Sequence, residues 1–345
     1  MRKRQYLWAV LLCSFLVLAL QAQDPVFKLK VDVPVVSLEA VVKDSNGRPL
    51  THLSLADFDI YEDGERQEIR YFEIAENPRS ILLVFDVTGV IEEQKPFMLQ
   101  AMDVFFKNLR EQDRVAVAAM GPEFEMLMNF RKLEKGKTVS VKLPPERIGS
   151  NIYDSLSMGA RRFSKDDTRR AIIAMTDGRD TFTWRETQRL GKVPDLSQDS
   201  DMKGQIADAR KRGVPYYFIA LDTDPRYLGK YDMEYAFFKN PDGYMRTKEY
   251  GNGERSPTIA EDYLAGVRLR MERLAEATGG RVLYPRNLSE VVFFFEQLSQ
   301  ELGQSYSLGY VPKSSLDDGK VHKIEVRTKA GYKVEQSRAS YGGGK

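Results

Sequence analysis

The sequence predicts a central α/β domain with a mostly parallel, doubly wound sheet, joined to a small antiparallel β unit made from the two ends of the chain. Short apolar runs alternate with amphipathic helical stretches through the middle of the chain, a rhythm typical of βα units. Both ends show the two-residue alternation of half-buried strands. At about 150 residues per domain, a chain of 345 residues is long enough for two domains.

The N-terminus predicts a secretory signal peptide over residues 1–22. Three basic residues at positions 2–4 precede an apolar run over 6–20, and Ala22 is a small residue at the expected cleavage point. The alternative is an uncleaved membrane anchor, but the run is shorter than the roughly 20 residues that a spanning helix needs. We therefore expect an exported protein, periplasmic or secreted, with no membrane span after removal of the signal.

Residues 23–78 read as short strands separated by turns. Positions 31–42 alternate between apolar and polar residues, 45–47 (Ser-Asn-Gly) form a turn signal, and 63–64 (Asp-Gly) form a hairpin signal. Such a small antiparallel piece is marginal on its own. We expect it to pack with the similar segment at residues 303–345 as one β-sandwich-like unit, whose last glycines, at 342–344, form a frayed end.

Residues 80–302 carry the alternation of strands and helices. A fully apolar run such as 81–85 is expected for a strand buried on both faces. The stretch 222–258 is long for a connection and predicts a lid, a binding loop or a small inserted subdomain. Arg169 and Arg170, just before an apolar run, indicate a solvated turn. The expected strands are 81–85, 114–120, 126–130, 171–175, 215–221 and 281–284, and the expected helices are 95–109, 152–163, 202–212, 260–278 and 288–302.

The rare residue types exclude several kinds of site. The two histidines, His52 and His322, are far apart in the sequence, and Cys13 lies within the predicted signal peptide. We therefore do not expect a Cys/His zinc site, a disulfide framework, or an enzyme of the Ser-His-Asp or Cys-His kind. Any metal site is expected to use oxygen ligands and a hard cation such as Mg²⁺, Ca²⁺ or Mn²⁺.

The charge balance points away from one class of partner. Removing residues 1–22 takes away three basic residues and no acidic one, so the net charge falls from +2 to −1. A nearly neutral chain gives no reason to expect a nucleic acid as partner.

Acidic residues end two of the expected buried strands. Asp86 follows the first strand of the central domain, and Asp177 follows the strand at 171–175. In an open α/β sheet the carboxyl ends of the strands form the ligand site, so these two carboxylates can converge on one cation. Thr88 and Ser150 could add hydroxyl ligands, with waters completing the shell. Asp180 is a nearby spare carboxylate.

These motifs resemble the von Willebrand factor type A (VWA) domain, and more closely the exported bacterial VWFA-related proteins known from acidobacteria. Residues 86–90 (Asp-Val-Thr-Gly-Val) stand where that family has its metal-ion-dependent adhesion motif (MIDAS), Asp-x-Ser-x-Ser. Residues 149–154 stand where the family carries a threonine of its metal site, and residues 176–180 match the family's later Ser/Thr-Asp-Gly motif. The flanking segments 57–64 and 306–310 look like the β segments of that subgroup, so the resemblance covers most of the chain.

The resemblance implies a site residue by residue. Asp86 and Asp177 match the acidic ligands, while Thr88 and Ser150 replace a serine and a threonine and keep a hydroxyl. Val90 replaces the second serine of the motif and has no ligand atom. We therefore expect weak or absent binding of Mg²⁺ or Mn²⁺, at a degenerate MIDAS-like site.

The expected function is binding to a protein partner, without catalysis. The first alternative is a metal-independent scaffold or interaction protein of the cell envelope. A metal-dependent hydrolase ranks below both, because no general base with a supporting partner is visible in the sequence.

Overall fold

The computed structural model describes residues 35–88, 91–134, 139–167, 169–181, 183, 200–221, 257–313 and 318–342. The predicted signal peptide, Val90 and nearly all of the 222–258 insertion lie outside these residues. Within the described ranges, no helix is long and apolar enough to cross a membrane.

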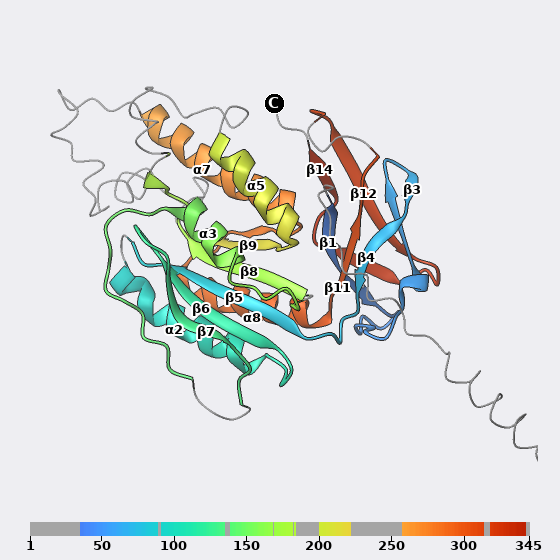
Figure 1. Cartoon of the computed structure of the whole chain (residues 1–345), viewed down its shortest axis with the longest axis horizontal. Helices are drawn as coiled ribbons and strands as arrows, with labels where there is room; N and C mark the ends of the chain where they lie inside the picture. Colours follow the sequence, from blue (N-terminus) through green and yellow to red (C-terminus); the bar gives the residue numbers. More distant parts are fainter. Residues whose placement is uncertain are drawn as a thin grey trace, which may run out of the picture. The chain divides into compact units, whose positions relative to one another are not determined.

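A six-stranded sheet forms the centre of the α/β domain (Figure 1). Its strands are β5 (Arg79–Asp86), β6 (Arg114–Met120), β7 (Glu125–Arg131), β8 (Arg169–Thr176), β9 (Tyr216–Ala220) and β10 (Val282–Leu283). They lie in the order β10-β9-β8-β5-β6-β7, and every neighbouring pair is parallel except β6 and β7. β5 is buried along its whole length because strands lie on both sides of it and helices cover both of its faces.

Helices pack on the two faces of this sheet (Figure 1). They are α2 (Ile91–Lys107), α3 (Ile152–Ala160), α5 (Ser200–Arg212), α7 (Pro257–Thr278) and α8 (Leu288–Gln304). The alternation of side chains along β5 separates the two cores: Leu83 and Phe85 pack with α2 and α8, whereas Leu82 and Val84 pack with α3, α5 and α7. The doubly wound arrangement predicted from the sequence is therefore confirmed.

The two ends of the chain build two four-stranded antiparallel sheets together. The strands are β1 (Val36–Lys43), β2 (Phe58–Glu62), β3 (Glu65–Gln67), β4 (Ile69–Glu73), β11 (Tyr306–Tyr310), β12 (Val321–Thr328), β13 (Lys333–Gln336) and β14 (Ser340–Gly342). Their orders are β13-β1-β11-β4 and β14-β12-β2-β3. N-terminal and C-terminal strands pair directly, as Leu38 with Leu308 and Ile60 with Val326, and all four residues belong to one core. This confirms the predicted β-sandwich-like unit.

The prediction of a solvated turn at Arg169 and Arg170 is wrong. Arg169 is the first residue of β8 and is only 4% exposed. Its guanidinium donates to the main-chain oxygens of Ala75 at 2.8 Å, Leu302 at 2.9 Å and Ser305 at 2.7 Å. These three oxygens lie where the chain passes between the β unit and the α/β domain, so Arg169 ties both connections to the sheet.

Gly342, the first of the three glycines predicted to form a frayed end, differs from that expectation, and Gly343 and Gly344 lie outside the described residues. Gly342 is the last residue of β14, which pairs with the start of β12, and is not part of a frayed end. Its φ is +87°, in the left-handed region that glycine adopts readily.

Candidate functional site

Two acidic loops leave the central sheet at the same edge. β5 and β8 are parallel neighbours, paired in register from Arg79 with Arg169 to Phe85 with Met175, so both strands end at the same level. Asp86 is the last residue of β5, and Asp177 directly follows the end of β8. We call the group formed by Asp86, Thr88, Ser150 and Asp177 the strand-end site.

Asp86 is 5% exposed and is held by two hydroxyl groups. Thr88 Oγ1 donates to Asp86 Oδ1 at 2.6 Å, and Thr176 Oγ1 donates to Oδ2 at 2.6 Å. Burial, and then the charge of the nearby Asp177, raise the pKa of Asp86 to about 7 against the effect of these hydrogen bonds. A carboxylate that is buried and close to a second acid is stabilised by a neighbouring cation.

Asp177 begins a tight turn. Asp177 Oδ1 accepts a hydrogen bond from the Arg179 main-chain N at 2.9 Å, and the φ of Gly178 is +74°. A Cβ at Gly178 would lie 2.6 Å from a methyl carbon of Val267 and 2.7 Å from the methyl carbon of Met271. Glycine is therefore needed here both for the turn and for the close packing of α7.

Arg179 provides a cation beside the acidic pair. Its Nη1 lies 3.5 Å from Asp177 Oδ2, and its side chain is 12% exposed. The guanidinium thus balances part of the negative charge at the strand-end site.

The loop that carries Ser150 joins the two acidic loops. Its main chain is hydrogen-bonded at both ends, from Arg147 N to Val87 O at 2.8 Å and from Asn151 N to Gly121 O at 2.9 Å. Ser150 itself exchanges two hydrogen bonds of 2.8 Å with Thr181, through its own main-chain N and O. The three loops are therefore fixed to one another by hydrogen bonds of their main chains and of the Thr181 hydroxyl.

The Ser150 hydroxyl differs from the other hydroxyl groups at the strand-end site. Ser150 is 2% exposed, and its Oγ has no hydrogen-bond partner among the residues that the structure describes. Buried polar side chains are normally paired, so an unpaired hydroxyl calls for a specific explanation.

Asp180 has a structural role. Its Oδ2 accepts the main-chain N–H of Ile152, the first residue of α3, at 3.0 Å, and its Oδ1 accepts that of Thr183 at 3.0 Å. A carboxylate at this position satisfies a free N–H of the first helical turn. Asp180 is thus committed to the start of α3 and is not a spare carboxylate.

The residues of the strand-end site suit a hard cation. They offer two carboxylates, two hydroxyl oxygens and no softer ligand, which is the type of donor set found around Mg²⁺ and Mn²⁺. Ser150 Oγ in particular has lone pairs that no described donor uses. Val90, the position predicted to lack a ligand atom, lies outside the described residues.

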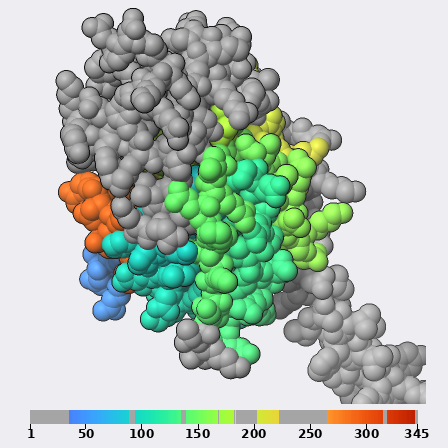
Figure 2. Space-filling view, turned by 90° about the vertical axis from the view of Figure 1, so that its left-hand side faces the viewer, coloured from blue at the N-terminus to red at the C-terminus, as the bar shows by residue number. Residues whose placement is uncertain are grey.

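One face of the molecule shows where the loop before α3 runs. In Figure 2 the green residues that follow β7 and lead into α3 lie at the surface beside the blue-green residues of α2. Ser150 lies near the end of this loop, just before α3.

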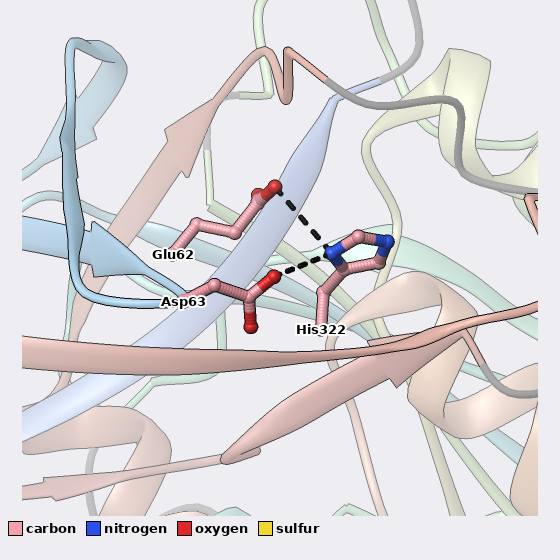
Figure 3. A group of neighbouring side chains, drawn as sticks. All are labelled: Glu62, Asp63 and His322. Carbon is pink, nitrogen blue, oxygen red and sulfur yellow. Dashed lines mark hydrogen bonds and ion pairs between the residues drawn. The ribbon is translucent and has the colours of Figure 1, made fainter.

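The β unit contains a second polar cluster, which sequence reasoning missed. His322, in β12, lies beside Glu62 and Asp63, at the end of β2 (Figure 3). The expectation that only oxygen ligands are available is therefore incomplete, because the described residues include a mixed nitrogen and oxygen set. The sequence does contain a signal for this cluster: Asp-Gly turns stand at 63–64 and 318–319, the first just after β2 and the second just before β12, the two strands that pair.

Comparison with known proteins gives a limited picture. The chain matches no protein-family model and no curated protein sequence. Among solved structures, it is similar to a von Willebrand factor type A protein from Catenulispora acidiphila, with a TM-score of 0.40 and 8% identity over 90% of this chain and 74% of that one. It is also similar to the ArnB paralog VWA2 from Sulfolobus acidocaldarius, with a TM-score of 0.38 and 11% identity over 90% and 76%.

A third similar structure is proximal thread matrix protein 1 from the mussel byssus, described with a zinc-occupied MIDAS motif. The TM-score is 0.38 and the identity 12%, over 70% of this chain and 49% of that chain, so this chain spans about half the length of the mussel protein. Similarities this weak carry no conclusion about function. The described fold is a doubly wound α/β domain with two small antiparallel sheets, and membership of the VWA family and of its exported bacterial subgroup stays a prediction.

Proposed function

We propose that the protein is an exported, non-enzymatic binding module that holds a protein partner at the strand-end site through a divalent cation, Mg²⁺ or Mn²⁺. The observation that carries this proposal is Ser150 Oγ, a buried hydroxyl with no described partner on a loop fixed between the two acidic loops. A ligand position for a cation explains why this hydroxyl is left unpaired.

The charges of the site suit a bridging role. Asp86 and Asp177 contribute two negative charges, and Thr88 and Ser150 contribute neutral oxygens. A divalent ion in this set would supply an open coordination position for a carboxylate of the partner. Because Val90 offers no ligand atom, the affinity for the ion is expected to be low, and the partner's carboxylate would complete the shell.

The sequence at residues 2–22 supports export, so we propose a partner in the cell envelope or outside the cell. A pull-down of the mature chain from envelope extract, with and without EDTA, identifies the partner and its dependence on metal.

One observation favours the alternative of a metal-independent scaffold. Arg179 Nη1 lies 3.5 Å from Asp177 Oδ2 and already supplies positive charge at the site. In that case the strand ends would bind no ion, and the partner would contact other surfaces.

Calorimetry separates the two proposals. The mature chain is titrated with Mg²⁺ and with Mn²⁺, alongside Asp86→Ala and the control Asp154→Asn, which changes an exposed carboxylate on α3. We expect heat of binding in the wild type and in Asp154→Asn, and none in Asp86→Ala. The absence of heat in the wild type, or its persistence in Asp86→Ala, would leave the metal-independent scaffold. Turnover in a broad substrate screen that is lost in Asp177→Ala would instead support the hydrolase.

A further inference from the structure

The polar cluster of the β unit lies where two antiparallel strands meet. Asp63 follows the end of β2, and its main-chain N donates to Lys323 O of β12 at 2.9 Å. The φ of Asp63 is +50°, and among the described residues it is the one non-glycine residue with positive φ. This left-handed turn, which aspartate tolerates better than most residues, brings the Asp63 side chain back over β12.

Three ligand-type atoms face one another in this cluster (Figure 3). His322 Nδ1 lies 2.7 Å from Asp63 Oδ2 and 3.9 Å from Glu62 Oε1. All three atoms lie within 4.8 Å of one another. Ligands of a tetrahedral zinc ion, each about 2.0–2.1 Å from the metal, are roughly 3.3 Å apart, so on binding the ion Asp63 Oδ2 would move away from His322 Nδ1 and Glu62 Oε1 would move towards it.

Asp318 fixes the orientation of the His322 ring. Its two carboxylate oxygens both lie 3.2 Å from His322 Nε2. An ionised carboxylate can only accept, so Nε2 carries the proton in this pairing. Nδ1 lies at hydrogen-bond distance, 2.7 Å, from Asp63 Oδ2, so either Nδ1 carries a second proton or a cation lies against its lone pair. A histidine that donates one N–H to a carboxylate and offers the other nitrogen is the usual arrangement of a metal ligand.

Glu62 supplies the second, independent observation. Its side chain is 5% exposed, and Glu62 Oε2 makes no hydrogen bond of normal geometry with a described residue, although the hydroxyl groups of Tyr310 and Tyr341 lie close to this carboxylate. The ring of Tyr341 stacks on His322, with 5.0 Å between the ring centroids, and closes the cluster on that side. A buried carboxylate in such surroundings is stabilised by a positive charge nearby.

We propose that Glu62, Asp63 and His322 bind a zinc ion, with Asp318 as the outer carboxylate that orients His322. One nitrogen and two carboxylate oxygens are a donor set that zinc accepts, and three protein ligands leave a fourth position for water. The Asp63 side chain is 48% exposed, so the ion reaches the site from the solvent side of the turn. This site lies in the β unit and does not depend on the strand-end site.

The competing state is a protonated His322 without a metal. Burial would lower the pKa of His322, but the hydrogen bonds with Asp63 and Asp318 outweigh it and raise the pKa. An imidazolium would satisfy both carboxylates, so the experiment must measure the metal itself.

The test measures zinc bound by the mature full chain in the Asp86→Ala background, which removes an acidic ligand of the strand-end site. The protein is treated with EDTA, freed of chelator and dialysed against Zn²⁺ at neutral pH, and bound zinc is measured by atomic emission and its affinity by calorimetry. The variants are His322→Gln, Asp318→Asn and the control His52→Gln, which removes the other histidine, an exposed one.

We expect about one zinc per chain in the background protein and in His52→Gln, and none in His322→Gln. Loss of an outer carboxylate typically weakens metal binding by 10–100-fold, so we expect a loss of about that size in Asp318→Asn. No bound zinc in the background protein, or equal zinc in His322→Gln, would overturn the proposal. If His322→Gln fails to fold, Asp318→Asn decides, since unchanged affinity in that variant also overturns it. The proposed function is tested by calorimetry with Mg²⁺ and Mn²⁺ on the chain with Asp86 intact, whereas the zinc proposal is tested in the Asp86→Ala background. Either proposal can therefore fail while the other holds.

Discussion

Replacing Ser150 by alanine tests the unpaired hydroxyl directly. Both hydrogen bonds between Ser150 and Thr181 use main-chain atoms of Ser150 and not its hydroxyl, so the loop is expected to keep its conformation. A buried polar group without a partner costs about 1–3 kcal/mol of desolvation. Removing the hydroxyl therefore leaves the metal-free protein equally stable, or more stable by about 1 kcal/mol.

The same change should remove stabilisation by metal. At a free Mg²⁺ concentration roughly ten times the dissociation constant, binding to the folded state alone adds about 1.4 kcal/mol to the free energy of unfolding. We expect this increment in the wild type and a much smaller one in Ser150→Ala, because a ligand oxygen is lost. A purely structural role for Ser150 would not produce this combination of unchanged or higher stability without metal and a smaller increment with Mg²⁺.

Urea denaturation at 25 °C, once in EDTA and once in Mg²⁺, measures both quantities. The matched control is Ser80→Ala, which removes a buried hydroxyl that does have a partner, Asp167 Oδ1 at 2.5 Å. A hydrogen bond to a charged group contributes about 1.5–3 kcal/mol, so this control should lose stability of that order in both buffers. A loss above about 1 kcal/mol for Ser150→Ala in EDTA, or an unchanged Mg²⁺ increment, would refute the reasoning.

Four further predictions concern the fold. Arg169→Met removes the Arg169 donor from three buried carbonyl oxygens, of which Ala75 O keeps a hydrogen bond from Arg110 Nη1, and should lower the free energy of unfolding by about 3–5 kcal/mol in urea. A loss below about 1 kcal/mol would contradict the role given to Arg169. Gly178→Ala places a Cβ at a position that has a positive φ and lies close to α7, so it should lower the free energy of unfolding by about 2–4 kcal/mol. An unchanged free energy of unfolding would mean that α7 shifts freely. Burial would raise the pKa of Asp113, but the hydrogen bonds and charge of Arg79 outweigh it and hold the pKa at about 2. This pKa lies below that of an aspartate in the unfolded chain, about 3.9, so the stabilisation is complete above pH 4 and is lost as the pH falls towards 2. The wild type should therefore be more stable than Asp113→Asn by on the order of 2 kcal/mol above pH 4, and acid denaturation should show this difference shrinking between pH 4 and pH 2. A fragment of residues 23–78 should show no cooperative unfolding by circular dichroism, since β1 and β2 pair with C-terminal strands that it lacks.

The elements of the central sheet could be predicted because their signals are local. The run 81–85 is apolar at every position, which a strand buried on both faces requires, and it lies in β5. The position of Asp86 and Asp177 at one edge follows from the same pattern, since parallel strands end together. The pairing of the chain ends could be predicted from size, because neither β segment could bury a core alone.

Other features depend on contacts that no local pattern contains. Two adjacent arginines usually indicate exposure, and only the carbonyl groups brought together by the fold make Arg169 a buried residue. Asp180 reads as a spare ligand until α3 begins beside it. His322 lies more than 250 positions from Asp63, and only the pairing of β2 with β12 brings them within 2.7 Å.

β4 and β11 are adjacent strands of one sheet, with Phe72 opposite Leu308. The chain leaves the β unit after β4 and returns to it at β11, so the two ends of the α/β domain are attached at points about one strand spacing apart, near 5 Å. A gap of that size can be closed by a short hairpin turn. The α/β domain is therefore an insertion at one point of the β unit: every strand pairing of that unit, together with the three residues of its proposed zinc site, lies outside the inserted residues.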